Sequence, residues 1–180
     1  IRAIRQAAPG VTVEVLVPDF AGDRASLDLV LDEVPEVFNH NIETVPRLYP
    51  TVRPEATYAR STEVLRRAVE HGGSVVKTGW MVGLGETSDE VQALLEAVAS
   101  LGVHMVTIGQ YLRPSKHQLP VLEYVAPEIF EQYAWYGEAL GLQMQSAPFV
   151  RSSFHAGEVF ARSGGDPRPS GGGASASPPD

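Results

Sequence analysis

The sequence predicts an α/β fold, built either as part of a (β/α) barrel or as an open parallel sheet. Short apolar runs rich in β-branched residues alternate with amphipathic segments of about three helical turns, as in successive βα units. Polar clusters follow the ends of these runs, where parallel sheets and barrels bind their ligands. Four or five such runs are too few to close an eight-stranded barrel.

The expected strands share alternating or continuous apolar residues, and they stop at glycine or at polar residues. The last of them is short, which leaves the count at four or five. In chain order they cover residues 11–17, 37–41, 75–82, 103–108 and 142–146.

The expected helices share apolar residues spaced three or four positions apart. Thr87 and Glu90 form a capping-box pattern before one helix, and Pro127 opens the last. Pro46 and Pro50 indicate a broken turn between two of the other helices. In chain order the helices cover residues 1–8, 27–34, 61–71, 88–101 and 127–140.

The chain has 180 residues, no cysteine, and a net charge of −8 from 14 basic and 22 acidic residues. This balance argues against nucleic-acid binding through a basic surface, and no run is long enough for a membrane span. The chain opens on Ile1 within a helical pattern, so we expect it to be part of a longer protein. Residues 1–161 are expected to form the folded part, and residues 162–180, rich in Gly, Ser and Pro, a disordered tail.

Residues 75–86 organise the chain, because an apolar strand there runs into Gly83 and Gly85 and then into Glu86. Glycines can adopt positive φ and let a ligand approach the backbone, and a strand–glycine–helix junction often binds anionic or polar ligands. The spacing matches neither the dinucleotide fingerprint nor a phosphate-binding loop. An ordinary tight turn is therefore the alternative.

Two other polar stretches are candidate sites. Alternation places Asn39, Asn41 and Glu43 on one face, where amides and a carboxylate suit the hydroxyls of a ribose, with a hydrogen-bonded polar rim as the alternative. His40, on the opposite face, is expected to be structural. The loop 113–117 contains two cations and a histidine, which suit a carboxylate or phosphate, with a solvated charged loop as the alternative.

Seven stretches form one ordered pattern along the chain. They are VEVLVPDF at 13–20, FNHNIETV at 38–45, VGLGE at 82–86, IGQYLRPS at 108–115, LPV at 119–121, EYV at 123–125 and VRSSFHA at 150–156. Together they resemble the lipoyl synthase family of radical S-adenosylmethionine (SAM) enzymes. The resemblance runs in order from the first residues to about Phe160.

The resemblance implies a partial TIM-like (β/α) barrel of the radical SAM type, of which this chain holds the last four strands and a C-terminal extension. It also implies S-adenosylmethionine and two 4Fe–4S clusters in the full-length enzyme. A 5′-deoxyadenosyl radical removes hydrogens from a protein-bound octanoyl chain, and the auxiliary cluster supplies two sulfur atoms to form the lipoyl group. Both cysteine motifs would lie upstream of Ile1, so this chain alone is expected to be inactive.

The resemblance assigns roles to single residues. Ser153 would ligate an iron of the auxiliary cluster, with Arg151 and Ser152 nearby. The ribose of S-adenosylmethionine would contact Asn39, Asn41 and Glu43. Its adenine side would be lined by Met81, Val82, Gly83, Gln110, Tyr111 and Leu112.

Four positions depart from the family pattern. Phe154 replaces a usual tyrosine, Thr78 a usual serine, and Ala147 a usual glycine. Trp80 replaces a smaller apolar residue and is expected to crowd the barrel interior.

The implied partners are octanoylated lipoyl-carrier domains, such as the glycine cleavage H protein and the acyltransferase subunits of 2-oxoacid dehydrogenases, and a flavodoxin or ferredoxin electron donor. No nucleic-acid or membrane partner is expected. The implied location is the bacterial cytoplasm, or mitochondria or plastids for a eukaryotic source. Two other functions stay open: a lyase or aldolase with Lys77 as its Schiff-base residue, and a non-catalytic carrier-binding domain.

Overall fold

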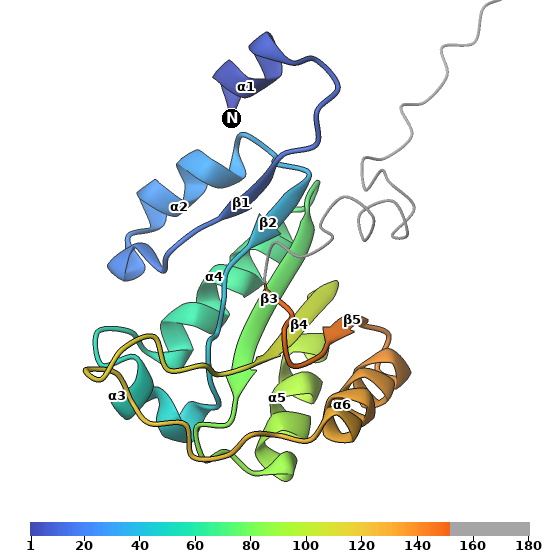
Figure 1. The fold of residues 1–180 in the computed structure, drawn as a ribbon. Coiled ribbons are helices and arrows are strands. Elements are labelled where there is room, and N and C mark those ends of the chain that lie inside the picture. Colours follow the sequence, from blue (N-terminus) through green and yellow to red (C-terminus); the bar gives the residue numbers. More distant parts are fainter. Residues whose placement is uncertain (152–180) are drawn as a thin grey trace, which may run out of the picture.

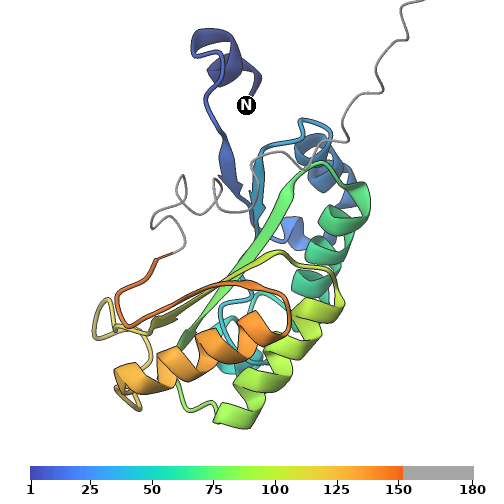
Figure 2. The ribbon, with the colours of Figure 1, turned by 90° about the vertical axis from the view of Figure 1, so that its right-hand side faces the viewer.

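The computed structural model describes residues 1–151, whose five strands form one parallel sheet in the order β1-β2-β3-β4-β5 (Figure 1). Helices α2, α4, α5 and α6 lie on one side of this sheet (Figure 2). The tail predicted to be disordered lies outside the described residues. The elements are α1 (Arg2–Ala7), β1 (Glu14–Leu16), η1 (Phe20–Gly22), α2 (Arg24–Leu31), β2 (Val37–Asn39), η2 (Pro46–Leu48), α3 (Tyr49–Val52), α4 (Tyr58–His71), β3 (Val75–Val82), α5 (Ser88–Ser100), β4 (Met105–Gln110), α6 (Pro127–Ala139) and β5 (Gln143–Ser146).

The predicted α/β class with a parallel sheet is confirmed, and the short run near residue 143 is a fifth strand beside β4. One row of paired residues crosses the whole sheet. It consists of Leu16, Asn39, Lys77, Met105 and Gln143. Strands β3 and β4 continue to pair beyond this row, up to Val82 and Gln110. Their carboxyl ends therefore form a rim, at which the candidate site lies.

The main core lies between the sheet and its helices. Phe38 and Val76 from the strands are fully buried, and they belong to one apolar cluster with Leu65 of α4 and Leu95 of α5. Trp80 belongs to the same cluster and is 3% exposed. The indole packs largely on the helix side rather than filling the barrel interior, because side chains alternate along β3. Trp80 still lines the pocket at the strand ends that is described below.

Local sequence signals explain several helix ends. The predicted capping box of α5 is confirmed: the Glu90 amide donates to the Thr87 hydroxyl, and the Thr87 amide donates to the Glu90 carboxylate. The segment at Pro46 and Pro50 is not a broken turn but η2 followed by α3. Each proline lies in the first turn of its helix, where a missing N–H leaves no intrahelical bond unmade. None of the described helices is both long and apolar enough to cross a membrane.

Candidate functional site

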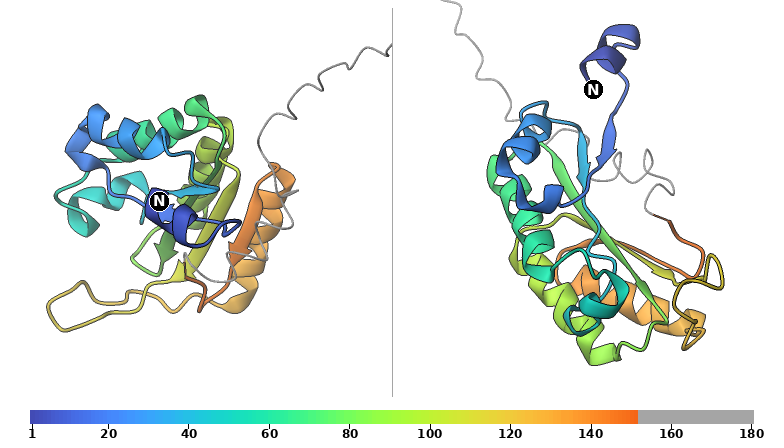
Figure 3. Two further views of the ribbon diagram at one scale, coloured as in Figure 1. Left: turned by 90° about the horizontal axis from the view of Figure 1, so that it is seen from above. Right: turned by 90° about the vertical axis from the view of Figure 1, so that its left-hand side faces the viewer.

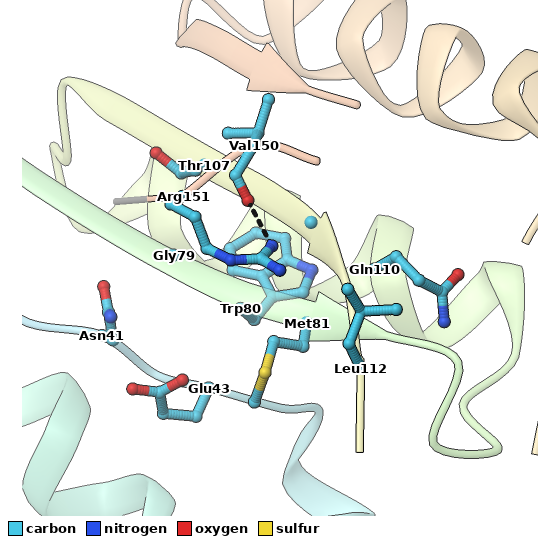
Figure 4. A pocket seen from close by; sticks show the side chains of 11 residues that line it. Asn41, Glu43, Gly79, Trp80, Met81, Thr107, Gln110, Leu112, Val150 and Arg151 are labelled. Atoms are coloured by element: carbon cyan, nitrogen blue, oxygen red, sulfur yellow. Dashed lines mark hydrogen bonds between the residues drawn. The ribbon is translucent and has the colours of Figure 1, made fainter. Parts of the chain in front are cut away.

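A pocket of about 200 Å³ lies at the carboxyl ends of β3 and β4, on the side of the sheet away from the helices. We call it the rim pocket. Asn41 and Glu43, in the segment after β2, form one wall of the pocket. Leu112 and Arg151 line the opposite side, and Met81 lies between the two sides (Figure 4). Side chains from four separate segments of the chain therefore meet at this point of the rim.

At two glycines the strand backbone itself forms part of the pocket surface. Gly79 of β3 and Gly109 of β4 both line it. A Cβ at Gly79 would lie 2.9 Å from the carbonyl oxygen of Thr107, and one at Gly109 would lie 2.6 Å from that of Val150. A larger residue at either position would displace neighbouring backbone. Glycine is therefore required at both positions by the close approach of the protein's own backbone.

Glu43 enters the pocket from an uncommon backbone conformation. Its φ of +72° lies in the left-handed region, which residues other than glycine seldom adopt. Its amide donates to the carbonyl of Gly79 at 3.0 Å, and its carbonyl accepts from the amide of Met81 at 3.0 Å. The chain thus stays paired with β3 after β2 has ended. Strain of this kind costs about 1–3 kcal/mol and is concentrated at functional sites.

The polar groups of this wall are incompletely satisfied by the protein. The Asn41 side-chain oxygen is buried and has no hydrogen-bond partner among residues 1–151. Burial raises the pKa of the Glu43 carboxyl above its ordinary value of 4.5, and hydrogen bonding by Asn41 and the positive charge of Arg53 offset this only in part. An amide oxygen and a carboxyl group in this arrangement can accept hydrogen bonds from neighbouring hydroxyls, such as those of a ribose.

Asn39 lies deeper inside the sheet and does not line the rim pocket. Its side-chain amide donates to the carboxylate of Glu14 at 3.1 Å, and the Lys77 ammonium lies 3.0 Å from the same oxygen. The side chain of Lys77 is fully buried. A Schiff-base lysine must lose its proton and reach a carbonyl group. The ammonium is held by the Glu14 carboxylate and its side chain has no exposed surface through which a carbonyl substrate could reach it, so the geometry argues against the lyase or aldolase alternative.

The turn after β3 is closed by the protein itself. The Glu86 carboxylate accepts hydrogen bonds from the amides of Gly83 and Leu84, and the Gly83 carbonyl accepts from the amides of Leu122 and Glu123. Gly83 has a φ of +103°, and a Cβ there would lie 2.5 Å from the Glu123 carbonyl oxygen. The glycines of this turn were predicted to let a ligand approach the backbone closely. In the structure the segment at Leu122 and Glu123 occupies that position.

Gln110 lies at the end of β4 and holds that later segment in place. Its side-chain nitrogen donates to the carbonyls of Tyr111 and Glu123, both at 3.0 Å, and its side-chain oxygen accepts from the amide of Val125 at 2.9 Å. Figure 4 shows this side chain pointing away from Glu43. The amide that was a candidate for adenine recognition is thus engaged within the protein.

The other residues predicted for the adenine side fall into two groups, those that line the pocket and those that are buried or bonded within the protein. Val82 is fully buried in the main core, and the Tyr111 hydroxyl donates to the carbonyl of Leu119 at 2.9 Å. Met81 and Leu112 line the rim pocket. The structure therefore brings together Asn41, Glu43, Met81, Gln110, Leu112 and Arg151 from the predicted set, although the side-chain amide of Gln110 is bonded within the protein. It places Asn39, Val82, Gly83 and Tyr111 elsewhere.

Five residues that line the pocket were not among the predicted site residues: Gly79, Trp80, Thr107, Gly109 and Val150. One signal could have indicated Gly79: in parallel strands, positions two apart share a face, so Gly79 accompanies Met81. His40 is structural as expected, because its ring Nδ1 lies 2.9 Å from the Val17 carbonyl and burial lowers its pKa.

The predicted iron ligand Ser153 and its neighbour Ser152 lie outside the described residues. Within residues 1–151, no three His, Cys, Asp or Glu side chains are grouped so that they could hold a metal ion. Arg151, the last described residue, lines the rim pocket and donates to the carbonyl of Val150 at 2.9 Å.

Comparison with known proteins identifies the fold family. The sequence model of the Radical SAM superfamily matches residues 1–98. A crystallised domain of pyruvate-formate lyase-activating enzyme from Bacteroides vulgatus superposes with a TM-score of 0.58 at 17% identity. The superposition covers 78% of this chain and 84% of that domain. At this identity the likeness concerns the fold alone, and it agrees with a partial barrel.

Curated relatives give a closer match. The lipoyl synthase of Pelodictyon phaeoclathratiforme is 55% identical over 157 residues, which are 87% of this chain and 53% of that protein. The lipoyl synthase of Rubrobacter xylanophilus is 52% identical over 160 residues, 88% of this chain and 50% of that protein. The resemblance noted from the sequence is thus confirmed, and the chain spans about half the length of these relatives.

Proposed function

Because the chain belongs to the radical SAM superfamily, we propose that it is the C-terminal half of a lipoyl synthase. The complete protein would insert two sulfur atoms into a protein-bound octanoyl chain and so make the lipoyl cofactor. The identity of more than half over 157 residues carries this proposal. Three of the stretches behind the resemblance, 38–45, 108–115 and 150–156, also supply part of the walls of the rim pocket.

The rim pocket fits the nucleoside part of S-adenosylmethionine. The unpartnered Asn41 oxygen and the Glu43 carboxyl would accept hydrogen bonds from the ribose hydroxyls. A flat base would lie against the part of the pocket that Gly79, Met81 and Gly109 line. When bound beside a reduced cluster, S-adenosylmethionine supplies the radical that abstracts hydrogen. The residues of this chain hold the nucleoside and shield it from water.

The complete enzyme would carry two 4Fe–4S clusters whose cysteines lie on the part of the protein that precedes this chain. The chain itself contributes Ser153, which we propose as an iron ligand of the auxiliary cluster. Arg151 and Ser152 would lie beside that cluster. A serine ligand is uncommon, since thiolates dominate such sites, so this assignment needs its own test.

Anaerobic reconstitution tests the proposed function. The complete protein should bind iron and sulfide and convert an octanoylated lipoyl-carrier domain to the lipoyl form. The 180-residue chain alone should bind no stable iron and form no product, since it contains no cysteine. Carrier binding without any product by the reconstituted complete protein would favour the carrier-binding alternative. Stable iron on the short chain would contradict the assignment of the clusters.

A pair of serine variants tests the iron ligand. In the complete protein, Ser153→Ala should lower sulfur insertion more than the neighbouring control Ser152→Ala. Cleavage of S-adenosylmethionine should change little in both, because that step depends on the other cluster. Equal losses of sulfur insertion in the two variants would remove the assignment of Ser153.

A further inference from the structure

The basic side chains of residues 1–151 fall into two groups. Eight of them lie within 4.0 Å of a carboxylate: Arg2, Arg5, Arg24, Arg47, Arg60, Arg66, Arg67 and Lys77. Within this part of the chain the other four form no such ion pair: Arg53, Arg113, Lys116 and Arg151. The charges of the first group are neutralised locally, so the second group dominates the positive potential that an approaching molecule meets.

The four cations without ion pairs gather at one edge of the molecule. Arg151 lines the rim pocket, and Arg53 donates to the backbone of its wall, to the Asn41 carbonyl at 3.1 Å. Arg113 and Lys116 follow directly on Leu112, which also lines the pocket. The net charge of the whole chain is −8, so this concentration does not reflect a general excess of basic residues.

Two of these cations lie on a segment that projects from the rim. Residues 111–126, which we call the rim arm, leave β4, extend away from the body of the molecule and return to α6 (Figure 3). The base of the rim arm is fixed by the hydrogen bonds of Gln110 to Glu123 and Val125. Leu122 and Tyr124 on its returning half are 66% and 76% exposed.

The tip of the rim arm is ordered by its own hydrogen bonds. The Arg113 guanidinium donates to the carbonyls of Gln118 at 2.9 Å and of Lys116 at 2.6 Å. The His117 amide donates to the Ser115 hydroxyl at 3.3 Å. Lys116 and His117 are exposed on this fixed loop. Because the loop is already shaped, little conformational entropy would be lost when a partner binds to it.

We propose that the rim arm docks an acidic face of the acylated carrier protein and so delivers the acyl chain to the rim pocket. The inference rests on the proposed function and adds the partner's charge and its docking surface. Exposed aromatic and aliphatic side chains beside a few cations suit a protein surface. Within residues 1–151 a nucleic acid would meet only four such cations, in a chain with 22 acidic residues, which disfavours it.

The test uses the complete protein and the variant Lys116→Glu. Arg2→Glu is the control, since Arg2 is 82% exposed and paired with Glu33 at the opposite end of the molecule from the rim arm (Figure 1). Two substrates are compared: an octanoylated lipoyl-carrier domain, and a short peptide that carries only an octanoylated lysine. Lys116→Glu should raise the KM for the carrier domain about fivefold at low salt, and less at high salt. The kcat, and both constants for the peptide, should not change.

Three results would overturn the proposal: an unchanged KM for the carrier, an equal rise for carrier and peptide, or an equal rise in Arg2→Glu. Equilibrium binding of the same carrier domain provides a second readout, which does not depend on turnover. If the wild-type protein makes no product but binds the carrier in a Lys116-dependent way, the proposed function fails and the docking surface stands. Binding of duplex DNA that Lys116→Glu abolishes would assign the rim arm to a different partner and overturn the proposal.

Discussion

Gly79 in β3 and Gly83 just after it differ in what approaches them. Gly79 lines the rim pocket, where the side-chain oxygen of Asn41 has no partner among the described residues. Gly83 is covered by the rim arm, which donates two amides to its carbonyl, and its own amide donates to Glu86. A glycine thus indicates that something approaches the backbone closely, but not whether it is a ligand or the protein's own chain.

The surroundings of the two glycines differ in whether the polar groups there already have hydrogen-bond partners. Around Gly83 the described backbone groups are paired, and Arg47 also donates to the Gly85 carbonyl at 2.8 Å. A ligand there would have to replace bonds that already exist. Around Gly79 a ligand can satisfy a group that lacks a partner, which is the more favourable exchange. Substitutions at the closed turn should therefore reduce stability, whereas substitutions at the rim pocket should reduce binding.

The largest expected effect is that of Gly83→Ala in the complete protein. The new methyl group would meet the Glu123 carbonyl at 2.5 Å, and alanine is strained at a φ of +103°. We expect a loss of about 3 kcal/mol in the free energy of unfolding, measured by urea denaturation. The control is Gly141→Ala, where φ is +86° but no atom lies within 4 Å of the new Cβ, so the loss should be about 1 kcal/mol. Equal losses would mean that the rim arm does not press on Gly83.

The next effect concerns the contact that closes the turn. Gln110→Leu leaves the Glu123 carbonyl and the Val125 amide without their side-chain partner. We expect a destabilisation of about 2 kcal/mol and faster hydrogen exchange of the amides in the rim arm. Gln132→Leu, at an exposed position of α6, is the control and should change neither. If exchange in the rim arm stays slow in Gln110→Leu, the arm is held by contacts other than Gln110.

The fold could be predicted from the sequence because its signals are local. Five parallel strands, the α5 capping box and the start of α6 all follow from apolar periodicity and end residues. The helices at Pro46 and Pro50 were not predicted, because proline disrupts a helix only beyond its first turn. The packing side of Trp80 follows from its position in β3, not from its size.

The candidate site could be predicted only in part, for a different reason. Asn41 and Glu43 lie where alternation predicts, but Asn39 is one repeat deeper and bonds to Glu14. The contacts of Gln110 join it to residues 13 and 15 positions later in the chain. No local pattern specifies such pairings, because they depend on the path of the rim arm after it leaves β4.

Asn39, which ends β2, and Asn41, which follows it, offer a smaller and more selective test. Asn41→Ala in the complete protein should weaken S-adenosylmethionine binding about tenfold, the effect of losing one or two ribose hydrogen bonds. Its free energy of unfolding should change by less than about 1 kcal/mol, because the lost oxygen has no partner among the described residues and the main loss is the single hydrogen bond to Glu43. Asn39→Ala should show the reverse pattern, since it removes a donor to Glu14 inside the sheet. Calorimetric titration and urea denaturation would measure the two quantities, and parallel effects in both variants would refute the distinction.

The smallest expected effect is a pH dependence at Glu43. Burial raises the pKa of this carboxyl in the folded protein, so the folded state binds its proton more tightly than the unfolded chain does. The resulting stabilisation is complete below the ordinary value of 4.5 and is lost as the pH rises through the raised folded value. Glu43→Gln, which cannot ionise, should therefore gain stability relative to the wild type over that interval and keep a constant difference above it. Urea denaturation at a series of pH values would measure this. If the difference in the free energy of unfolding between Glu43→Gln and the wild type does not vary with pH, water reaches Glu43 freely. The rim pocket would then differ from the closed turn in shape but not in how far its groups are removed from water.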